Sequence, residues 1–269
     1  MNHIKGSQIR ESVHVNIPFE MLYTSYLPRF LEQGINPEIG LDAGSLDKYE
    51  SRHFAAVAGR LRDRGLRITV HAPFSDLSPG SPDPGIWQWT RHRFEQTLDA
   101  VACFRPRTLV CHAGYDDTRY HEGRAQWIEK SLEMWSWFAG SLQHQGCPLM
   151  LENAYEEDPQ DIQAIFEGLS DPGVGFCLDM GHQSAFGKAP LDRWLKILGP
   201  YLGQVHLHDN HGSRDEHLAL GKGSIDFGPL FQALGSGGRE PPVITLEPHR
   251  EEDLGPSLAF LERNWPWQA

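Results

Sequence analysis

The sequence lacks several features that would place the protein in or across a membrane. No apolar run approaches the roughly 18 residues that a membrane span needs, and the opening segment MNHIKGSQIRES contains no apolar stretch of the secretory type. We therefore expect a cytoplasmic protein without a membrane partner. Only four cysteines occur in 269 residues, with no CxxC pair, and they lie in or beside apolar segments. This pattern favours reduced thiols over disulfides, and we assign them no role.

Positive charge is also scarce. The chain has 24 Lys and Arg residues against 36 Asp and Glu residues, a formal net charge of −12. Such a protein has no global field that attracts polyphosphate, and no basic segment interleaved with aromatic residues indicates a duplex-binding surface. We expect a small phosphorylated or sugar substrate, with duplex DNA as the less favoured alternative. Bound metal ions would still make the local potential positive.

Eight short, apolar and β-branched segments predict strands, each bounded by Gly, Pro or Asn. They are residues 13–17, 37–41, 67–71, 108–112, 148–152, 174–179, 204–208 and 243–247. Segments of helical character follow them at residues 20–33, 46–64, 85–104, 123–145, 159–169, 191–198, 226–234 and 251–262. This alternation predicts an α/β protein, a (β/α)8 TIM barrel that forms a single domain over residues 1–269. The Pro- and Gly-rich residues 75–85 are then a loop on the barrel rim and not an interdomain linker.

A His, Asp or Glu stands where six of the predicted strands end. The runs are HAPF (71–74), CHAGY (111–115), LENA (151–154), LDMGH (178–182), VHLHDN (205–210) and LEPH (246–249). Because the carboxyl ends of barrel strands surround one mouth, we expect a single polar site there. Side chains two positions apart share a strand face, so Met150, Cys177 and Thr245 should lie below Glu152, Asp179 and Glu247 as largely apolar filling.

Four of these side chains form the expected core of a metal site, namely Glu152, Asp179, His206 and Glu247. Carboxylate oxygen and imidazole nitrogen suit Zn or Mn best, and also Mg or Co. Five more candidate ligands are His71, His112, His182, Asp215 and His217. This number of ligands predicts between one and three divalent ions per chain.

Residues 205–228 carry the candidates for substrate contact. His206 and His208 are two positions apart, so both can face the site, and we expect His208 to contact the substrate. The run Gly221–Lys222–Gly223–Ser224 lacks the GxxxxGK[ST] form and follows no strand, which excludes a Walker loop. We expect it to offer backbone N–H groups and Lys222 to an anionic substrate, with Arg250 as a further phosphate contact.

From the first predicted strand to LEPH, these motifs resemble the xylose isomerase-like TIM-barrel superfamily. That superfamily includes sugar isomerases and epimerases and the endonuclease IV type of AP endonuclease. In the epimerase branch a Glu–Asp–His–Glu tetrad holds one ion and its two glutamates move protons. The resemblance assigns these roles to Glu152, Asp179, His206 and Glu247.

The endonuclease branch of the superfamily adds ligands that build a trinuclear zinc site. The resemblance places those additional ligands at His71, His112, His182, Asp215 and His217. All nine positions therefore hold the matching residue type. His208 is a departure, since the endonuclease pattern usually has Asn at this position.

Two enzymatic hypotheses follow, together with a binding protein that does not turn over substrate. The favoured one is phosphoester hydrolysis at two or three ions, because every additional ligand then has a role. Glu152 would bridge two ions, with His71 and His112 on one, and with Asp179, His206 and Glu247 on the other. His182, Asp215 and His217 would hold a third ion. The alternative is a sugar or sugar-phosphate isomerase or epimerase, with one ion and with Glu152 and Glu247 as the catalytic proton-transfer pair.

Overall fold

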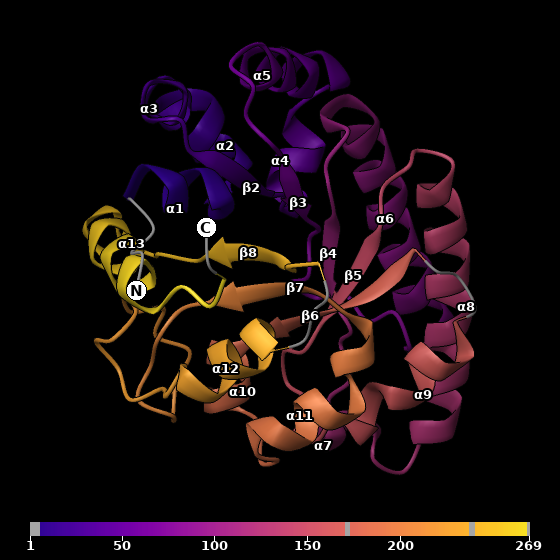
Figure 1. The fold of residues 1–269 in the computed structure, drawn as a ribbon. Helices are drawn as coiled ribbons and strands as arrows, with labels where there is room; N and C mark the ends of the chain where they lie inside the picture. Colours follow the sequence, from indigo (N-terminus) through magenta and orange to yellow (C-terminus); the bar gives the residue numbers. More distant parts are fainter. Residues whose placement is uncertain (1–5, 170–172, 237–239, 268–269) are drawn as a thin grey trace.

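The computed structural model describes residues 6–169, 173–236 and 240–267. Eight parallel strands close into a barrel in chain order, with β1 paired to both β2 and β8, and the helices lie outside it (Figure 1). The predicted (β/α)8 barrel is confirmed. Among the described residues, none of the helices is both long and apolar enough to cross a bilayer.

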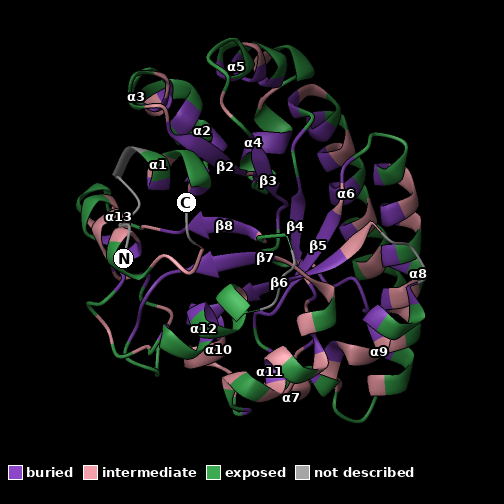
Figure 2. Ribbon diagram, viewed as in Figure 1, coloured by how far each residue is buried: buried purple, intermediate pink, exposed green. Residues whose placement is uncertain are grey.

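Each strand begins and ends within two residues of its predicted bounds. The strands are β1 Val13–Pro18, β2 Asn36–Gly40, β3 Thr69–His71, β4 Leu109–His112, β5 Leu149–Glu152, β6 Val174–Asp179, β7 Leu202–Leu207 and β8 Val243–Leu246. The strands are almost entirely buried, whereas the surrounding helices are exposed along their outer faces (Figure 2). This burial on both sides explains why the strand segments are apolar runs without alternation.

The outer helices differ from the predicted ones mainly by being divided. They are α1 Gly6–Ser12, α2 Phe19–Met21, the π-helix η1 Leu22–Tyr26, α3 Leu27–Gln33, α4 Ala43–Lys48, α5 Ser51–Asp63, α6 Pro84–Phe104, α7 Asp117–Tyr120, α8 Arg124–Gln143, α9 Gln160–Gly168, α10 Met180–Ala185, α11 Leu191–Ile197, the 3-10 helix η2 Gly199–Tyr201, α12 Gly228–Ser236 and α13 Glu251–Asn264. The helices α1, α7 and α10 were not predicted, because seven residues or fewer show too little periodicity.

The loop after β3 packs closely against the outer helices. Ser78 and Ser81 are buried, and a Cβ atom on Gly80 would lie 2.4 Å from the Trp127 ring of α8. Only glycine fits this position without a shift of the ring. Residues 75–83 thus form a packed loop on the rim, as predicted, while residues 84 and 85 already belong to α6.

Inside the barrel, one layer of side chains lies directly below the polar strand ends and supports them. Two residues before His112, Glu152 and Asp179 lie Val110, Met150 and Cys177, which form an apolar cluster apart from the main core. Two residues before His71, His206 and Glu247 lie Thr69, Gln204 and Thr245, which all hydrogen-bond to Glu38 of β2. The expected apolar filling is therefore confirmed at Met150 and Cys177 but wrong at Thr245, which belongs to the polar network. The buried Glu38 carboxylate requires hydrogen-bond donors there.

Candidate metal centre

The polar strand ends face a cavity of about 450 Å³ at the barrel mouth. His71, His112, Glu152, His182 and Glu247 line it, together with Asp215 and His217 from the loop after β7. Asp179 and His206 lie at its floor with no exposed surface. The structure therefore brings the nine predicted ligands together at one place.

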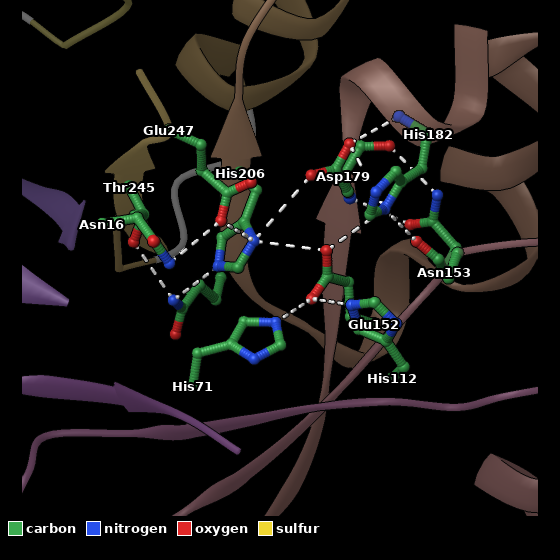
Figure 3. Close-up of polar contacts among 12 residues, drawn as sticks. Asn16, His71, His112, Glu152, Asn153, Asp179, His182, His206, Thr245 and Glu247 are labelled. Atoms are coloured by element: carbon green, nitrogen blue, oxygen red, sulfur yellow. Dashed lines mark hydrogen bonds and ion pairs between the residues drawn. The ribbon is translucent and has the colours of Figure 1, made fainter. Parts of the chain in front are cut away.

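Glu152 lies at the centre of this cluster, and Figure 3 shows four imidazoles around it. Its Oε2 atom is 3.0 Å from His71 Nε2 and 3.7 Å from His112 Nε2. Its Oε1 atom is 3.3 Å from the Nδ1 atoms of both His182 and His206. The two carboxylate oxygens face different imidazole pairs, which is the arrangement that a carboxylate bridging two cations requires.

The predicted tetrad converges on one atom, His206 Nδ1. This nitrogen lies 3.1 Å from Glu247 Oε1, 3.3 Å from Glu152 Oε1 and 3.8 Å from Asp179 Oδ2. The side chains come from the ends of β5, β6, β7 and β8, so barrel closure itself produces this geometry. Four ligand groups thus surround one point on the cavity floor.

A third group of ligands comes from α10 and from the loop after β7. Asp215 Oδ2 lies 3.0 Å from His217 Nε2 and 3.4 Å from His182 Nε2. His182 reaches this position because α10 begins directly after β6, where the Asp179 carboxylate accepts a hydrogen bond from the His182 N–H at 2.6 Å. Asp179 therefore both faces the tetrad and caps the helix that carries His182.

His208 belongs to this third group, so the expectation that it contacts substrate is wrong. Its ring is 1% exposed, lies between Asp179 and Asp215, and is not part of the cavity wall. It packs directly on Gly181, where a Cβ atom would lie only 1.8 Å from the imidazole. The same ring stacks on His217 at a centroid distance of 3.8 Å. His208 therefore supports the ligand group from inside the protein.

Burial and the mixture of charges set the protonation of the site. Burial alone would raise the pKa of the Glu152 carboxyl, but the charges of His206 and His112, with hydrogen bonds from His182 and His206, hold it well below the usual range. Burial also opposes ionisation of Asp215, yet hydrogen bonds from His182 and His217 lower its pKa. Burial lowers the pKa of His112 to about 3. Ionised carboxylates and a neutral imidazole are the forms that bind cations.

Four imidazoles of the centre have the opposite shift, a raised pKa, namely His71, His182, His206 and His217. Burial would lower the pKa of His206, but the neighbouring Cys177, Glu38 and Glu152 raise it well above the usual value. Burial would likewise lower the pKa of His182, but the carboxylates of Asp179, Asp215 and Glu152 outweigh this effect and raise the pKa well above the usual value. The carboxylates therefore stabilise positive charge at both positions, which divalent cations would also provide.

These residues fit divalent cations by spacing and by their unused atoms. Ligands about 2.0–2.2 Å from a tetrahedral zinc lie about 3.3–3.6 Å from one another, close to the distances between the carboxylates and imidazoles of this site. Among the described residues, His206 Nδ1, His208 Nδ1 and Asp215 Oδ1 are buried without a hydrogen-bond partner. Buried polar atoms normally have partners, so these atoms indicate sites for ions.

The Gly221–Ser224 turn does not serve the anionic substrate as predicted. The N–H groups of Gly221, Gly223 and Ile225 donate to the buried Asp209 carboxylate at 2.9–3.1 Å. Those of Lys222 and Ser224 donate to backbone carbonyls. The turn is therefore saturated, and Lys222 does not line the cavity.

Arg250 is also absent from the wall of the metal cavity. It lines a neighbouring space of about 360 Å³ between β1, α3 and α13. The structure thus places Arg250 beside the metal cavity and not in its wall, and a contact with substrate stays a prediction.

Two residues of the site were not predicted. Glu38 lies in the middle of β2 and is fully buried, with its Oε1 atom 3.1 Å from His206 Nε2. A single carboxylate inside an apolar, β-rich segment is a sequence signal that could have identified it. His249 lines the cavity and stacks on His217 at 3.7 Å. It follows Glu247 in the LEPH run and could have been included on that basis.

Comparison with known proteins identifies the family. Residues 36–264 match the family model described as xylose isomerase-like TIM barrel. The chain belongs to this family. A probable endonuclease 4 of Mycobacterium marinum is 30% identical over 221 residues, covering 76% of this chain and 81% of that protein.

Solved structures extend the comparison to other members. A Thermus thermophilus protein solved after soaking with ZnCl2 is 28% identical, with a TM-score of 0.77 over 94% of this chain and 97% of that chain. A D-tagatose 3-epimerase-like protein is 22% identical, with a TM-score of 0.80 over 94% of this chain and 97% of that chain, which shows the shared fold alone. The family is therefore one of enzymes, with a relative named as a probable endonuclease.

Proposed function

We propose that this protein is a divalent-metal-dependent hydrolase that cleaves a phosphoester at a centre of two or three ions. The observation that carries the proposal is the division of the candidate ligands into overlapping groups that Glu152 and His182 link. His71, His112 and Glu152 form one such group, Glu152, Asp179 and His182 another, and His182, His208, Asp215 and His217 a further one. A single ion would leave most of these ligands without a role.

The ion-binding residues have distinct tasks in this proposal. Divalent ions supply activation of water and neutralisation of phosphate charge when bound. Glu152 holds adjacent positions together through its two oxygens, while His71 and His112 complete the first group. Asp179, His206 and Glu247 would hold a neighbouring ion on the cavity floor together with Glu152. Asp215 and His217 border the cavity from the loop after β7.

The shape of the cavity supports a small substrate. Its volume of about 450 Å³ lies within the range of sites for small ligands. The aromatic rings of Phe74 and Tyr155 border the cavity. The Phe74 ring stacks on His112 at a centroid distance of 4.4 Å, and Phe74 is 50% exposed, while Tyr155 is 58% exposed. These rings offer flat, apolar contacts beside the ligands, as a phosphoester with a planar or cyclic organic group would use.

The tetrad also supports a second candidate, a sugar or sugar-phosphate isomerase or epimerase. Glu152 and Glu247 approach His206 Nδ1 from two sides at 3.3 and 3.1 Å, so both carboxylates could face a sugar carbon above a shared ion. In that case the imidazoles around the rim would bind sugar hydroxyls. This candidate uses fewer of the observed ligands, and we place it second for that reason.

A substrate panel with Zn or Mn added distinguishes the two candidates. The panel contains phosphomonoesters, phosphodiesters, abasic DNA and ketose–aldose pairs. We expect release of phosphate or alcohol, with no deuterium from D2O entering a sugar carbon. Deuterium incorporation that Glu247→Gln abolishes would instead establish the epimerase. Lys222→Ala serves as the control and should retain full activity in either case.

A further inference from the structure

We propose that Glu38 is a positioning residue that holds His206 in the tautomer a metal ion requires. This inference rests on ion binding by the tetrad, which both candidate functions share. Glu38 does not line the cavity and does not reach substrate. It acts through His206, from the layer of side chains below the ligands.

The two nitrogens of His206 face opposite partners. Nδ1 points to the carboxylates of the tetrad, whereas Nε2 lies 3.1 Å from Glu38 Oε1. Gln204 Nε2 also lies 3.1 Å from His206 Nε2, but the two protons of this amide have acceptors in Glu38 Oε2 at 2.6 Å and Thr245 Oγ1 at 3.2 Å, which leaves Glu38 as the partner of Nε2. A neutral imidazole carries one proton, and its other nitrogen is the acceptor or the metal ligand. With the proton on Nε2 and donated to Glu38, the Nδ1 lone pair is free to bind an ion. Metal-bound histidines commonly donate their second N–H to a carboxylate or carbonyl in this way.

The surroundings of Glu38 fix its orientation. Its Oε2 atom accepts hydrogen bonds from Thr69 Oγ1 at 3.0 Å, Thr245 Oγ1 at 2.9 Å and Gln204 Nε2 at 2.6 Å. Its Oε1 atom accepts from Asn16 Nδ2 at 3.3 Å, and the same amide reaches Glu247 Oε1 at 3.4 Å. Figure 3 shows Asn16 and Thr245 beside His206 and Glu247. These donors come from β1, β3, β7 and β8, so Glu38 is held from four strands besides its own.

This asymmetry determines what Glu38→Gln would do. Three donors converge on the Oε2 position, so the amide oxygen of the new side chain would occupy it. The NH2 group would then face His206 Nε2, which can interact favourably with it only as an acceptor. The His206 proton would move to Nδ1, the atom that faces the tetrad, and would block ion binding there. An amide in place of a carboxylate beside a histidine selects the wrong tautomer in the same manner in other sites.

The first test measures zinc affinity of the full-length protein against a competing chromophoric chelator. We expect Glu38→Gln to bind zinc about 10–100-fold more weakly than wild type, with an unchanged circular dichroism spectrum. Thr69→Val is the matched control, because it removes one donor from Oε2 and leaves the partner of His206 in place; its affinity should change less than about 3-fold. Equal affinities for wild type and Glu38→Gln would overturn the proposal.

The second test measures the wild type itself and uses a variant only to assign signals. In 15N NMR spectra of the zinc-loaded wild type, with the His206 signals assigned from His206→Asn, we expect a protonated Nε2 and a metal-bound Nδ1. A metal-bound Nε2 would overturn the positioning role while leaving the metal centre intact. Failure of wild type to bind zinc at all would instead contradict the metal centre on which both proposals rest.

Discussion

Two halves of the barrel interior support the same ring of ligands in different ways. Under β4–β6 the supporting layer is apolar, with Val110, Met150 and Cys177 packed together. Under β3, β7 and β8 the corresponding positions are Thr69, Gln204 and Thr245, and all three donate hydrogen bonds to Glu38. One half therefore fixes its ligands by packing, and the other half fixes them by a buried polar network.

The two layers differ because Glu152 and His206 need different hydrogen-bond partners from the side chains below them. Glu152 has histidine partners on both oxygens, so an apolar layer is sufficient to support it. His206 has a second nitrogen that faces inward, and an apolar layer would leave this nitrogen unsatisfied. The polar half therefore fixes the orientation of its side chains, but it is sensitive to substitution. Replacing one member of the network leaves other buried polar groups without a hydrogen-bond partner, which lowers stability.

The largest expected effect concerns the ligand above the apolar half. Glu152→Gln should lower turnover by more than about 100-fold, because second-sphere changes alone cost 10–100-fold and this residue faces two ligand groups directly. Metal content, measured by elemental analysis, should fall as well. The fold should persist, since the layer below Glu152 does not hydrogen-bond to it. Full activity in this variant would show that the proposed core of the site is wrong.

The next largest effect is on stability and contrasts the halves directly. Glu38→Leu should lower the free energy of unfolding by about 3–5 kcal/mol, because five donors lose their acceptor in a buried site. Met150→Leu in the apolar half keeps volume and should cost less than about 1.5 kcal/mol. Urea denaturation monitored by tryptophan fluorescence measures both. Similar losses in the two variants would remove the distinction between the halves.

The pH dependence of stability should come in part from His14, two residues below Asn16 on β1. Burial lowers the pKa of His14 from 6.5 to about 4, so the folded protein resists a proton that the unfolded chain accepts. Above pH 6.5 His14 is neutral in both the folded and the unfolded chain, and the free energy of unfolding has its full value. As the pH falls towards 4, the unfolded chain binds the proton first, and the free energy of unfolding decreases. The loss amounts to about 3 kcal/mol.

A variant of His14 isolates this contribution to the stability. His14→Leu cannot titrate at this position, so its unfolding free energy should depend less on pH between 6.5 and 4 than that of wild type. Urea denaturation at several pH values measures both proteins. Identical pH dependence in wild type and variant would show that His14 does not contribute.

The smallest expected effects come from a reciprocal exchange between the halves. Thr245→Val removes one hydroxyl from the Glu38 network and should cost about 1 kcal/mol of stability. Val110→Thr places a hydroxyl in the apolar cluster, where an unsatisfied group should cost about 1–3 kcal/mol. Thermal unfolding of the two variants measures both changes. A stabilising Val110→Thr substitution would indicate that a partner for a hydroxyl exists in the apolar half.

Much of this arrangement was predictable because function lies at strand ends. The eight strands and the positions of Glu152, Asp179, His206 and Glu247 follow from apolar segments that each stop at a polar residue. Barrel closure then brings residues together that are far apart in the chain. These four side chains are placed at one mouth by the strand order alone, without any predicted distance.

The residues that the sequence did not place correctly depend on contacts between distant segments. Glu38 is only a charged residue within a strand segment until β3, β7 and β8 supply its donors. The Gly221–Ser224 turn resembles an open anion loop until Asp209, twelve residues earlier, is found to occupy its N–H groups. His208 lies two positions after His206 and was therefore expected to face the substrate, but Gly181 and the carboxylates of Asp179 and Asp215 enclose its ring. No local pattern reports such pairings.

The central claim is that this barrel holds more than one ion. Elemental analysis of the protein equilibrated with zinc, before and after His217→Asn, tests it most directly. We expect two or three zinc ions per chain in the wild type and fewer in His217→Asn. One zinc ion per chain, unchanged by the substitution, would contradict the multinuclear centre and favour the single-ion epimerase instead.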